Sequence, residues 1–320
     1  MNETLMTPGF VWPDLAEVAA VLTLQGGYNT TLVMLGAAAL GIAAGAVGVF
    51  AMLRRRALVS DAVAHATLPG IAVAFIAAAA FGLPGRSPMV LTAGAAIAAV
   101  LALVAIQALA RVSRVPEDTA TAAVLASTFG LGLALLSIVQ SLRTGGQAGL
   151  DAYIFGSTAG MLESEAYMMA ALAAACLVAL ALVFKELAAV AFDPAFATAS
   201  GLSVTRLDAV VAALSLATVV IGLRVVGLVL IVALLVIPPA AARFWSDRLP
   251  VVVAVSALFG ALSAFLGAAI SAVAPDVPTG ATIVVVGAAL FAFSVFFGAA
   301  RGLAIRALGR RQPALAETPA

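Results

Sequence analysis

Long apolar segments recur along almost the whole chain, and they leave few folds open to it. Several reach the roughly 20 residues that an α-helix needs to cross a bilayer. They are apolar on all sides, whereas a surface helix of a soluble domain carries only one apolar stripe. Charged residues make up 10% of the chain, against about 25% in an average soluble domain. The sequence therefore predicts an all-α, polytopic membrane protein.

We predict eight to nine transmembrane helices, some of them broken or re-entrant, within a membrane domain at 29–303. The segment 1–28 is predicted to be an amphipathic surface helix or a loosely ordered stretch, and 304–320 a tail. The predicted spans lie at about 31–53, a second ending near 81, 88–110, 118–140, 165–184, 205–223, 225–242, 250–273 and 281–300. If the two spans that meet near Arg224 are broken or re-entrant, the number of spans falls to eight.

Lys and Arg are distributed unevenly between the two ends of these spans. Thirteen of the sixteen fall on one face, and the other face carries only Arg86, Arg143 and Arg224. Because cytoplasmic loops carry an excess of Lys and Arg, the first face is predicted to be cytoplasmic, with the N-terminus outside and the C-terminus inside. The sequence shows no basic patch with interleaved aromatic residues, so we predict a lipid bilayer and no nucleic acid as the surroundings.

The only histidine, His65, stands four residues after Asp61, and long apolar runs flank the pair. Residues at i and i+4 share one face of a helix. Imidazole suits zinc and iron, and carboxylate suits manganese. Ionisable side chains at membrane depth are costly, so a pair found there indicates a functional site. The alternative is a hydrogen-bonded pair that only tethers two helices.

Pro69 and Gly70 follow the pair by about one helical turn. A Pro-Gly step inside an apolar segment predicts a helix break, and such breaks line the substrate path in transporters. An ordinary proline kink is the alternative.

A more polar segment separates two blocks of apolar spans near residues 184–202. Asp193 and Pro194 have the order of an N-cap and a first helical residue, and Gly201 is typical of a helix stop. They predict a short helix outside the hydrocarbon, on the cytoplasmic face.

Four stretches, in order, carry a resemblance to a known family. Residues 54–72, which contain Asp61, His65, Pro69 and Gly70, resemble the signature of manganese/zinc/iron permeases of ATP-binding cassette (ABC) importers. Three later stretches, Phe192–Leu202, Val226–Arg243 and Val277–Ile283, are similar to further segments of that family. The match runs from about residue 30 to 300. Pro239 departs from it, since many relatives have another small residue there.

The resemblance implies the transmembrane permease subunit of an ATP-driven Mn²⁺, Zn²⁺ or Fe²⁺ importer in the inner membrane of a bacterium. Such a chain is not an enzyme. The sequence has no phosphate-binding loop of the G-x-x-x-x-G-K-[ST] type, so ATP hydrolysis is expected in separate cytoplasmic ATP-binding subunits. A second permease subunit, identical or paralogous, and an extracytoplasmic metal-binding protein are the other implied partners. The metal is cargo, and no permanently bound cofactor is expected.

The resemblance also implies roles for particular residues. Asp61 and His65 are the expected metal contacts, near the predicted helix break at Pro69 and Gly70. The expected residues for coupling to the ATPase are Phe192, Asp193, Pro194, Ala197, Gly201 and Leu202. Asp151, Glu163 and Glu165 are candidate contacts for the binding protein, although acidic loop residues are often simply solvated.

Three other functions remain open on the sequence alone. A secondary cation transporter would work without an ATPase and would need no coupling helix. An intramembrane metalloprotease would need more metal ligands and an H-E-x-x-H motif, which this sequence lacks. An importer of a chelated cofactor would have a wide apolar pathway, in which Asp61 beside His65 would have no purpose.

Overall fold

The chain forms helices throughout the part that the computed structural model describes, which is residues 15–81, 87–113, 115–141, 160–274 and 277–304. This confirms the predicted all-α fold. The domain bounds predicted at residues 28 and 303 stay a prediction. The helices are α1 (Leu15–Leu22), α2 (Tyr28–Leu53), α3 (Ala57–Ala80), α4 (Pro88–Val112), α5 (Glu117–Ser141), α7 (Glu163–Leu182), α8 (Phe184–Phe192), α9 (Pro194–Ala199), α10 (Val204–Val226), α11 (Leu228–Ala242), α12 (Leu249–Val273) and α13 (Thr279–Phe297).

Eight of these helices are long and apolar enough to cross a membrane. The apolar helix α11 is shorter: its 15 residues extend over about 22 Å, against about 30 Å of hydrocarbon. It meets α10 at Gly227, slightly beyond the predicted junction near Arg224. Gly227 has a φ of 79°, in the left-handed region that glycine adopts without steric cost. The structure thus has eight full-length candidate spans and one short apolar helix.

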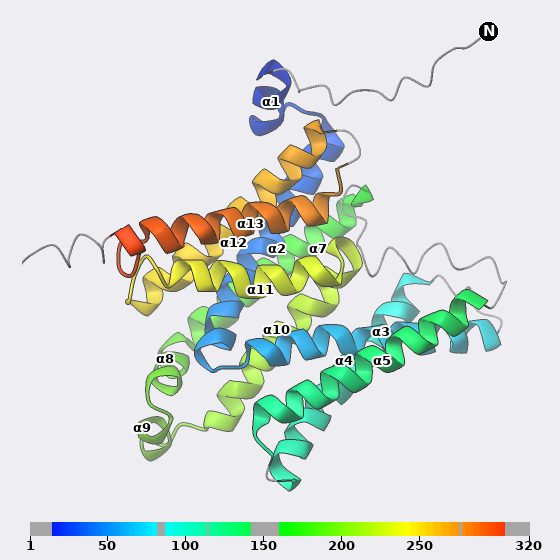
Figure 1. The fold of residues 1–320 in the computed structure, drawn as a ribbon, viewed down its shortest axis with the longest axis vertical. Coiled ribbons are helices and arrows are strands. Elements are labelled where there is room, and N and C mark those ends of the chain that lie inside the picture. Colours follow the sequence, from blue (N-terminus) through cyan, green and yellow to red (C-terminus); the bar gives the residue numbers. More distant parts are fainter. Residues whose placement is uncertain (1–14, 82–86, 114, 142–159, 275–276, 305–320) are drawn as a thin grey trace, which may run out of the picture.

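Helix α2 lies at the centre of the larger helix group and packs against α7, α10, α11 and α12 (Figure 1). A Cβ atom on Gly41 of α2 would collide with the carbonyl of Gly260 of α12, and the converse is also true. Small residues of this kind let membrane helices approach closely. Nearby, the Ser256 hydroxyl donates to the carbonyl of Gly45 at 2.6 Å. The glycine-rich helix α2 is therefore buried within the bundle along most of its length.

Helices α3, α4 and α5 form a second group beside the first (Figure 1). α3 packs mainly against α4 and α5, and α10 contacts helices of both groups. The two groups are therefore joined chiefly through α10 and through the turn that leads from α2 into α3.

The predicted helix break at Pro69 and Gly70 is wrong. α3 is one continuous helix that contains Pro69. Packing explains why the proline does not end it: Gly70 lies against the backbone of Gly94 of α4, and Gly132 of α5 lies against the Pro69 ring. A proline removes one amide donor, but close contacts with two neighbouring helices hold the surrounding turns in place.

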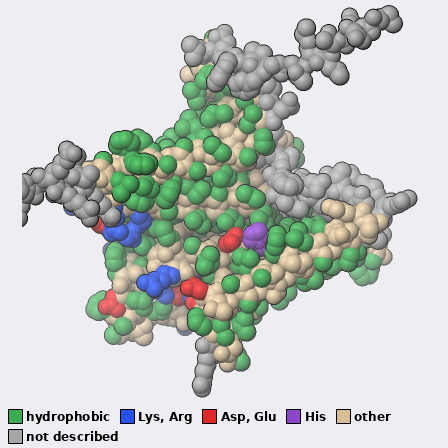
Figure 2. Space-filling model, viewed as in Figure 1, with side chains coloured by type: hydrophobic (Ala, Val, Ile, Leu, Met, Phe, Trp, Pro, Cys, Tyr) green, Lys and Arg blue, Asp and Glu red, His purple; other side chains and the backbone are tan. Residues whose placement is uncertain are grey.

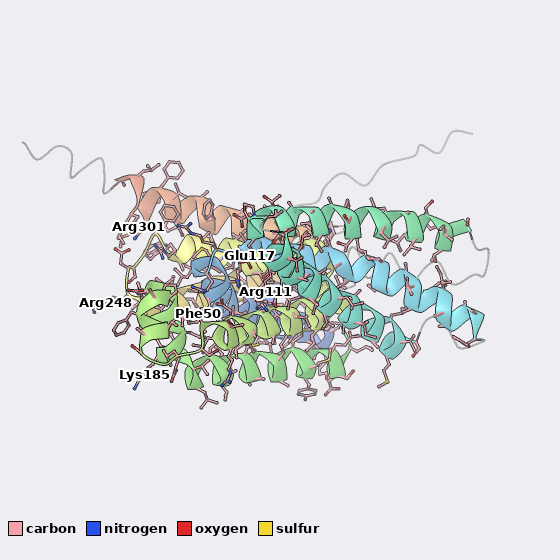
Figure 3. The ribbon with its side chains drawn as sticks, turned by 90° about the horizontal axis from the view of Figure 1, so that it is seen from below. Phe50, Arg111, Glu117, Lys185, Arg248 and Arg301 are labelled. Atoms are coloured by element: carbon pink, nitrogen blue, oxygen red, sulfur yellow. The ribbon has the colours of Figure 1, made fainter. Side chains whose placement is uncertain are left out.

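Basic side chains gather at one end of the helices. This end contains Lys185, Arg248 and Arg301, together with α8, the start of α12 and the end of α13 (Figure 3). This is the end that the sequence assigns to the cytoplasm.

Candidate metal pathway site

Asp61 and His65 lie one above the other in the second and third turns of α3. His65 Nε2 is 3.4 Å from Asp61 Oδ1, and the two side chains are 22% and 30% exposed. Both residues belong to the same helix, so this contact does not tether two helices, as the alternative from the sequence supposed. The pair presents a carboxylate and an imidazole together at the border of the protein interior.

The imidazole of His65 has one nitrogen without a partner. Nδ1 is buried and, among the described residues, accepts or donates no hydrogen bond. Buried polar atoms are nearly always paired, so such an exception needs an explanation. The ring of Phe129, on α5, meets the imidazole edge to face at a centroid distance of 4.9 Å. Phe129 is a site residue that the sequence did not indicate.

The single histidine of the chain reaches the molecular surface next to an acidic side chain, between the two helix groups (Figure 2). The surface around it is mostly apolar. Asp61 and His65 are thus a polar pair whose immediate surroundings on this face are mostly apolar.

The pair supplies two ligands and no more. Within the described ranges, no group of three or more His, Cys, Asp or Glu could hold a metal ion. A structural zinc site has four ligands and a magnesium site six. Pro69 is buried one turn further along α3, and Gly70 lies against α4. These two residues therefore add no metal ligand to the pair. One chain alone therefore offers only part of a coordination shell.

The short helix between the membrane blocks has the predicted ends. Asp193 caps α9, since its Oδ1 accepts hydrogen bonds from the amides of Ala195 at 3.0 Å and Phe196 at 2.9 Å. Pro194 is the first helical residue, and Gly201 has a φ of 85°. These predictions of local structure are confirmed, and the role of the helix in coupling stays a prediction.

Two exposed aromatic side chains lie on either side of the Asp193 cap, Phe192 at the end of α8 and Phe196 on α9. Phe192 is 71% exposed and Phe196 is 63% exposed. Ala197 is buried, so it holds α9 against the protein, and Leu202 closes the turn by donating its amide to the Ala197 carbonyl at 3.0 Å. Phe196 was missed by sequence reasoning, although an aromatic residue in a short helix between two blocks of spans is a usable signal.

The outer acidic residues have local partners where the structure describes them. Asp151 lies outside the described residues. Glu163 is hydrogen-bonded to the side chain of Tyr28, and Glu165 Oε2 accepts from the amide of Leu162 at 3.0 Å. Contact of these carboxylates with a binding protein stays a prediction.

Together, these features define a class: a polytopic α-helical membrane protein with a carboxylate–imidazole pair on one spanning helix and a capped helix between its membrane blocks. Residues 28–298 match the model of the ABC 3 transport family, and the chain belongs to this family. It is the membrane permease of an ABC importer, whose ATPase is a separate subunit. The predictions of this family, and of a chain that is not itself an enzyme, are confirmed.

Named relatives agree with this assignment. The chain is 35% identical over 280 residues to the manganese transport system membrane protein MntC of Bacillus subtilis, covering 88% of this chain and 63% of that one. This chain therefore spans less than two thirds of that relative. It is 35% identical over 296 residues to the zinc transport system membrane protein TroC of Treponema pallidum, covering 92% and 98%.

A solved structure, PsaBC from Streptococcus pneumoniae in complex with Fab, is similar with a TM-score of 0.75 and 29% identity. The similarity covers 90% of this chain and 98% of that chain. Neither a secondary transporter nor an intramembrane protease is favoured by these relationships.

Proposed function

We propose that this permease carries a divalent metal ion across the membrane past Asp61 and His65. The observation that supports this is their geometry: the only histidine of the chain lies 3.4 Å from a carboxylate on a spanning helix, and both side chains are partly exposed. The relatives named for manganese and zinc transport support a divalent metal as cargo. The same pair of donors also suits Fe²⁺.

Two such chains, identical or paralogous, would share one pathway. A carboxylate and an imidazole exposed to acyl chains would be costly, which argues that another protein surface faces them. A second permease subunit would bring a second carboxylate and imidazole to the same ion. A shell assembled in this way is open enough to release its cargo, as conduction requires.

The capped helix α9 would couple this movement to ATP. Phe192 and Phe196 offer large apolar contacts, and aromatic side chains supply much of the contact energy in protein interfaces. The proposed partners are cytoplasmic ATP-binding subunits, whose hydrolysis cycle would push on α9. Asp193, Pro194 and Gly201 fix the ends of the helix, and Ala197 and Leu202 seat it on the protein.

The permease would lie in the bacterial inner membrane with its N-terminus outside and its C-terminus in the cytoplasm. The gathering of Lys185, Arg248 and Arg301 at one end supports this orientation (Figure 3). A metal-loaded binding protein would then dock on the opposite side, where Asp151, Glu163 and Glu165 are candidate contacts.

The first prediction tests the pair directly. We expect Asp61→Ala and His65→Ala each to abolish uptake of radioactive Mn²⁺ or Zn²⁺ by cells, because either change removes half of the ligands that one chain supplies. The complex should still assemble, since both side chains lie partly exposed and bond chiefly to each other. Co-purification of the subunits checks assembly.

The control is Asp247→Ala, which removes a carboxylate that is 65% exposed and pairs with Arg301 near the cytoplasmic end. Its uptake should match wild type. Uptake at the wild-type level in either Asp61→Ala or His65→Ala would contradict the proposed site.

A further inference from the structure

We propose that Asp208 is a positioning residue that passes movement of the coupling segment to α3, the helix that carries Asp61 and His65. This inference rests on the proposed function. It concerns a cluster that we call the Asp208 cluster, formed by Arg54, Arg56 and Asp208 at the end where the basic residues gather.

Asp208 holds both arginines. Its carboxylate accepts a bidentate contact from Arg54, with Nε 2.8 Å from Oδ1 and Nη2 2.9 Å from Oδ2. Arg56 Nη2 lies 3.4 Å from Oδ2. Bidentate pairs of this kind fix geometry as well as adding energy. Asp208 is only 8% exposed, so its charge depends on these two partners rather than on water.

The two arginines bracket a very short turn. Only Arg54, Arg55 and Arg56 separate α2 from α3, and Arg55 has a φ of 57°. A residue with a side chain adopts this left-handed conformation only when its surroundings impose it. Because the residues on either side of Arg55 are both bound to Asp208, the position of Asp208 sets the shape of the turn.

Asp208 is connected to the coupling segment in two ways. It lies on α10, seven residues after Gly201, which ends the turn behind α9. In addition, Arg54 Nη1 donates to the carbonyl of Val190 on α8 at 3.1 Å. A displacement of α8 and α9 therefore reaches the Asp208 cluster through one hydrogen bond and through the first turn of α10.

The Asp208 cluster is also close to the Asp61–His65 pair, because Arg56 stands at the start of α3. Arg56 precedes α3, and Asp61 follows it by five residues, or about 7.5 Å along a helix. Arg56 also pairs with Glu117, at the start of α5, at 3.2 Å, so both helices that contribute to the site are held at this point.

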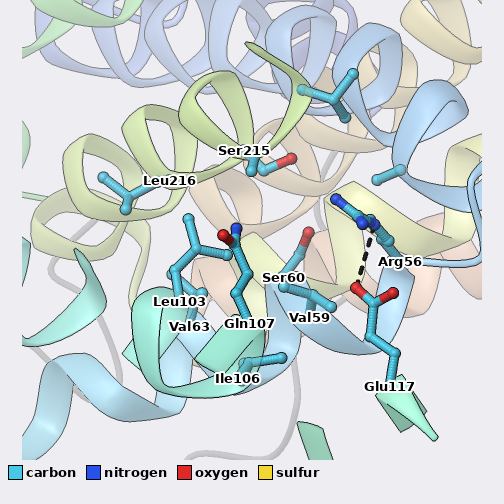
Figure 4. A pocket seen from close by; sticks show the side chains of 13 residues that line it. Arg56, Val59, Ser60, Val63, Leu103, Ile106, Gln107, Glu117, Ser215 and Leu216 are labelled. Atoms are coloured by element: carbon cyan, nitrogen blue, oxygen red, sulfur yellow. Dashed lines mark ion pairs between the residues drawn. The ribbon is translucent and has the colours of Figure 1, made fainter. Parts of the chain in front are cut away.

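A small cavity lies in the packing beside Arg56. Arg56 and Glu117 border this cavity of about 20 Å³ between α3, α4, α5 and α10 (Figure 4). The hydroxyl of Ser215 on its wall is buried and has no hydrogen-bond partner among the described residues. Protein interiors are otherwise close-packed. The ion pairs thus add to the apolar packing of α3 against α10, which involves Val59, Val63 and Val220.

The test compares metal transport with ATP consumption. The permease is reconstituted in vesicles with its ATP-binding subunits and binding protein, and radioactive Mn²⁺, Zn²⁺ and Fe²⁺ are used in turn as the probe. In Asp208→Asn, which keeps the shape of the side chain and removes its charge, we expect ions moved per ATP hydrolysed to fall at least tenfold. Metal affinity should stay within twofold of wild type.

Two further variants separate positioning from general stability. Asp208→Glu keeps the charge and should restore most of the wild-type ratio of ions moved per ATP hydrolysed. Asp247→Asn removes an exposed carboxylate paired with Arg301 at the same end, and it should leave the ratio unchanged. If Asp208→Asn does not assemble, Arg56→Gln, which leaves the Arg54–Asp208 pair in place, should show the same fall.

A wild-type ratio of ions to ATP in Asp208→Asn, or in Arg56→Gln where the first variant does not assemble, would overturn this proposal and leave the proposed function standing. A wild-type complex that moves none of Mn²⁺, Zn²⁺ and Fe²⁺ would overturn the proposed function, and this proposal with it.

Discussion

At the scale of single residues, the site contains one contact between near neighbours in the sequence and others between residues that are far apart in it. Asp61 and His65 are one turn apart on α3, so their meeting follows from helix geometry and could be predicted from the sequence. Phe129 meets His65 only because α5 packs on α3. Likewise, Arg54 and Asp208 are 154 positions apart. Contacts of this second kind depend on tertiary packing, so they cannot be predicted from the local spacing of residues in the sequence.

Phe129 should matter for metal affinity. Phe129→Leu keeps an apolar side chain but removes the ring whose contact orients His65. Ring contacts of this type contribute about 0.5–1.5 kcal/mol beyond buried area, which corresponds to a roughly two- to tenfold weaker affinity. Equilibrium dialysis of the purified permease complex with Mn²⁺ or Zn²⁺ measures it.

Phe293→Leu is the matched control, because Phe293 stacks with Trp245 and Phe297 in a separate aromatic cluster. Affinity should not change in that variant. Equal affinities for wild type and Phe129→Leu would show that the ring does not orient the imidazole.

At the scale of helices, local signals were reliable at helix ends and unreliable inside helices. The cap at Asp193 and the stop at Gly201 were predicted correctly, because both act on the backbone within a few residues. The break at Pro69 was wrong, because contacts of α4 and α5 hold that helix together. Helix α11 is short because it begins only after the left-handed turn at Gly227. The sequence around Gly227 is continuously apolar, so hydropathy does not reveal this boundary.

The crossing of α2 and α12 gives a prediction on stability. Gly260→Ala places a methyl group against the backbone of Gly41, and overpacking of this kind costs about 1–3 kcal/mol. We therefore expect a lower midpoint in thermal unfolding of the permease in detergent.

Gly130→Ala, on α5, is the control, since an added Cβ there has no neighbour within 4 Å. Alanine favours a helix over glycine by about 1 kcal/mol, so this variant should unfold at the same or a higher temperature. An unchanged midpoint in Gly260→Ala would mean that the two helices can separate at no cost.

At the scale of the whole molecule, hydropathy and composition predicted the membrane class and the range of span numbers. They did not predict that α3, α4 and α5 would form a group of their own, joined to the rest chiefly through α10, with smaller contacts from α11 and α2 to α3. That arrangement arises from close backbone contacts such as Gly70 with Gly94, whose partners cannot be paired from one sequence.

The proposed orientation can be checked on intact cells. With the buried Cys176 replaced by Ala, Ala195→Cys on α9 should react with a membrane-impermeant thiol reagent only after the inner membrane is opened. Leu162→Cys, at the other end and 58% exposed in the native residue, should react before. The reverse pattern would place the N-terminus inside.

The unbroken course of α3 through Pro69 has a mechanical consequence. If α3 tilts as one body, a movement of Ala57 toward the neighbouring helices carries Ala80 away from them. The two ends of the pathway beside α3 would then open in alternation and never at the same time.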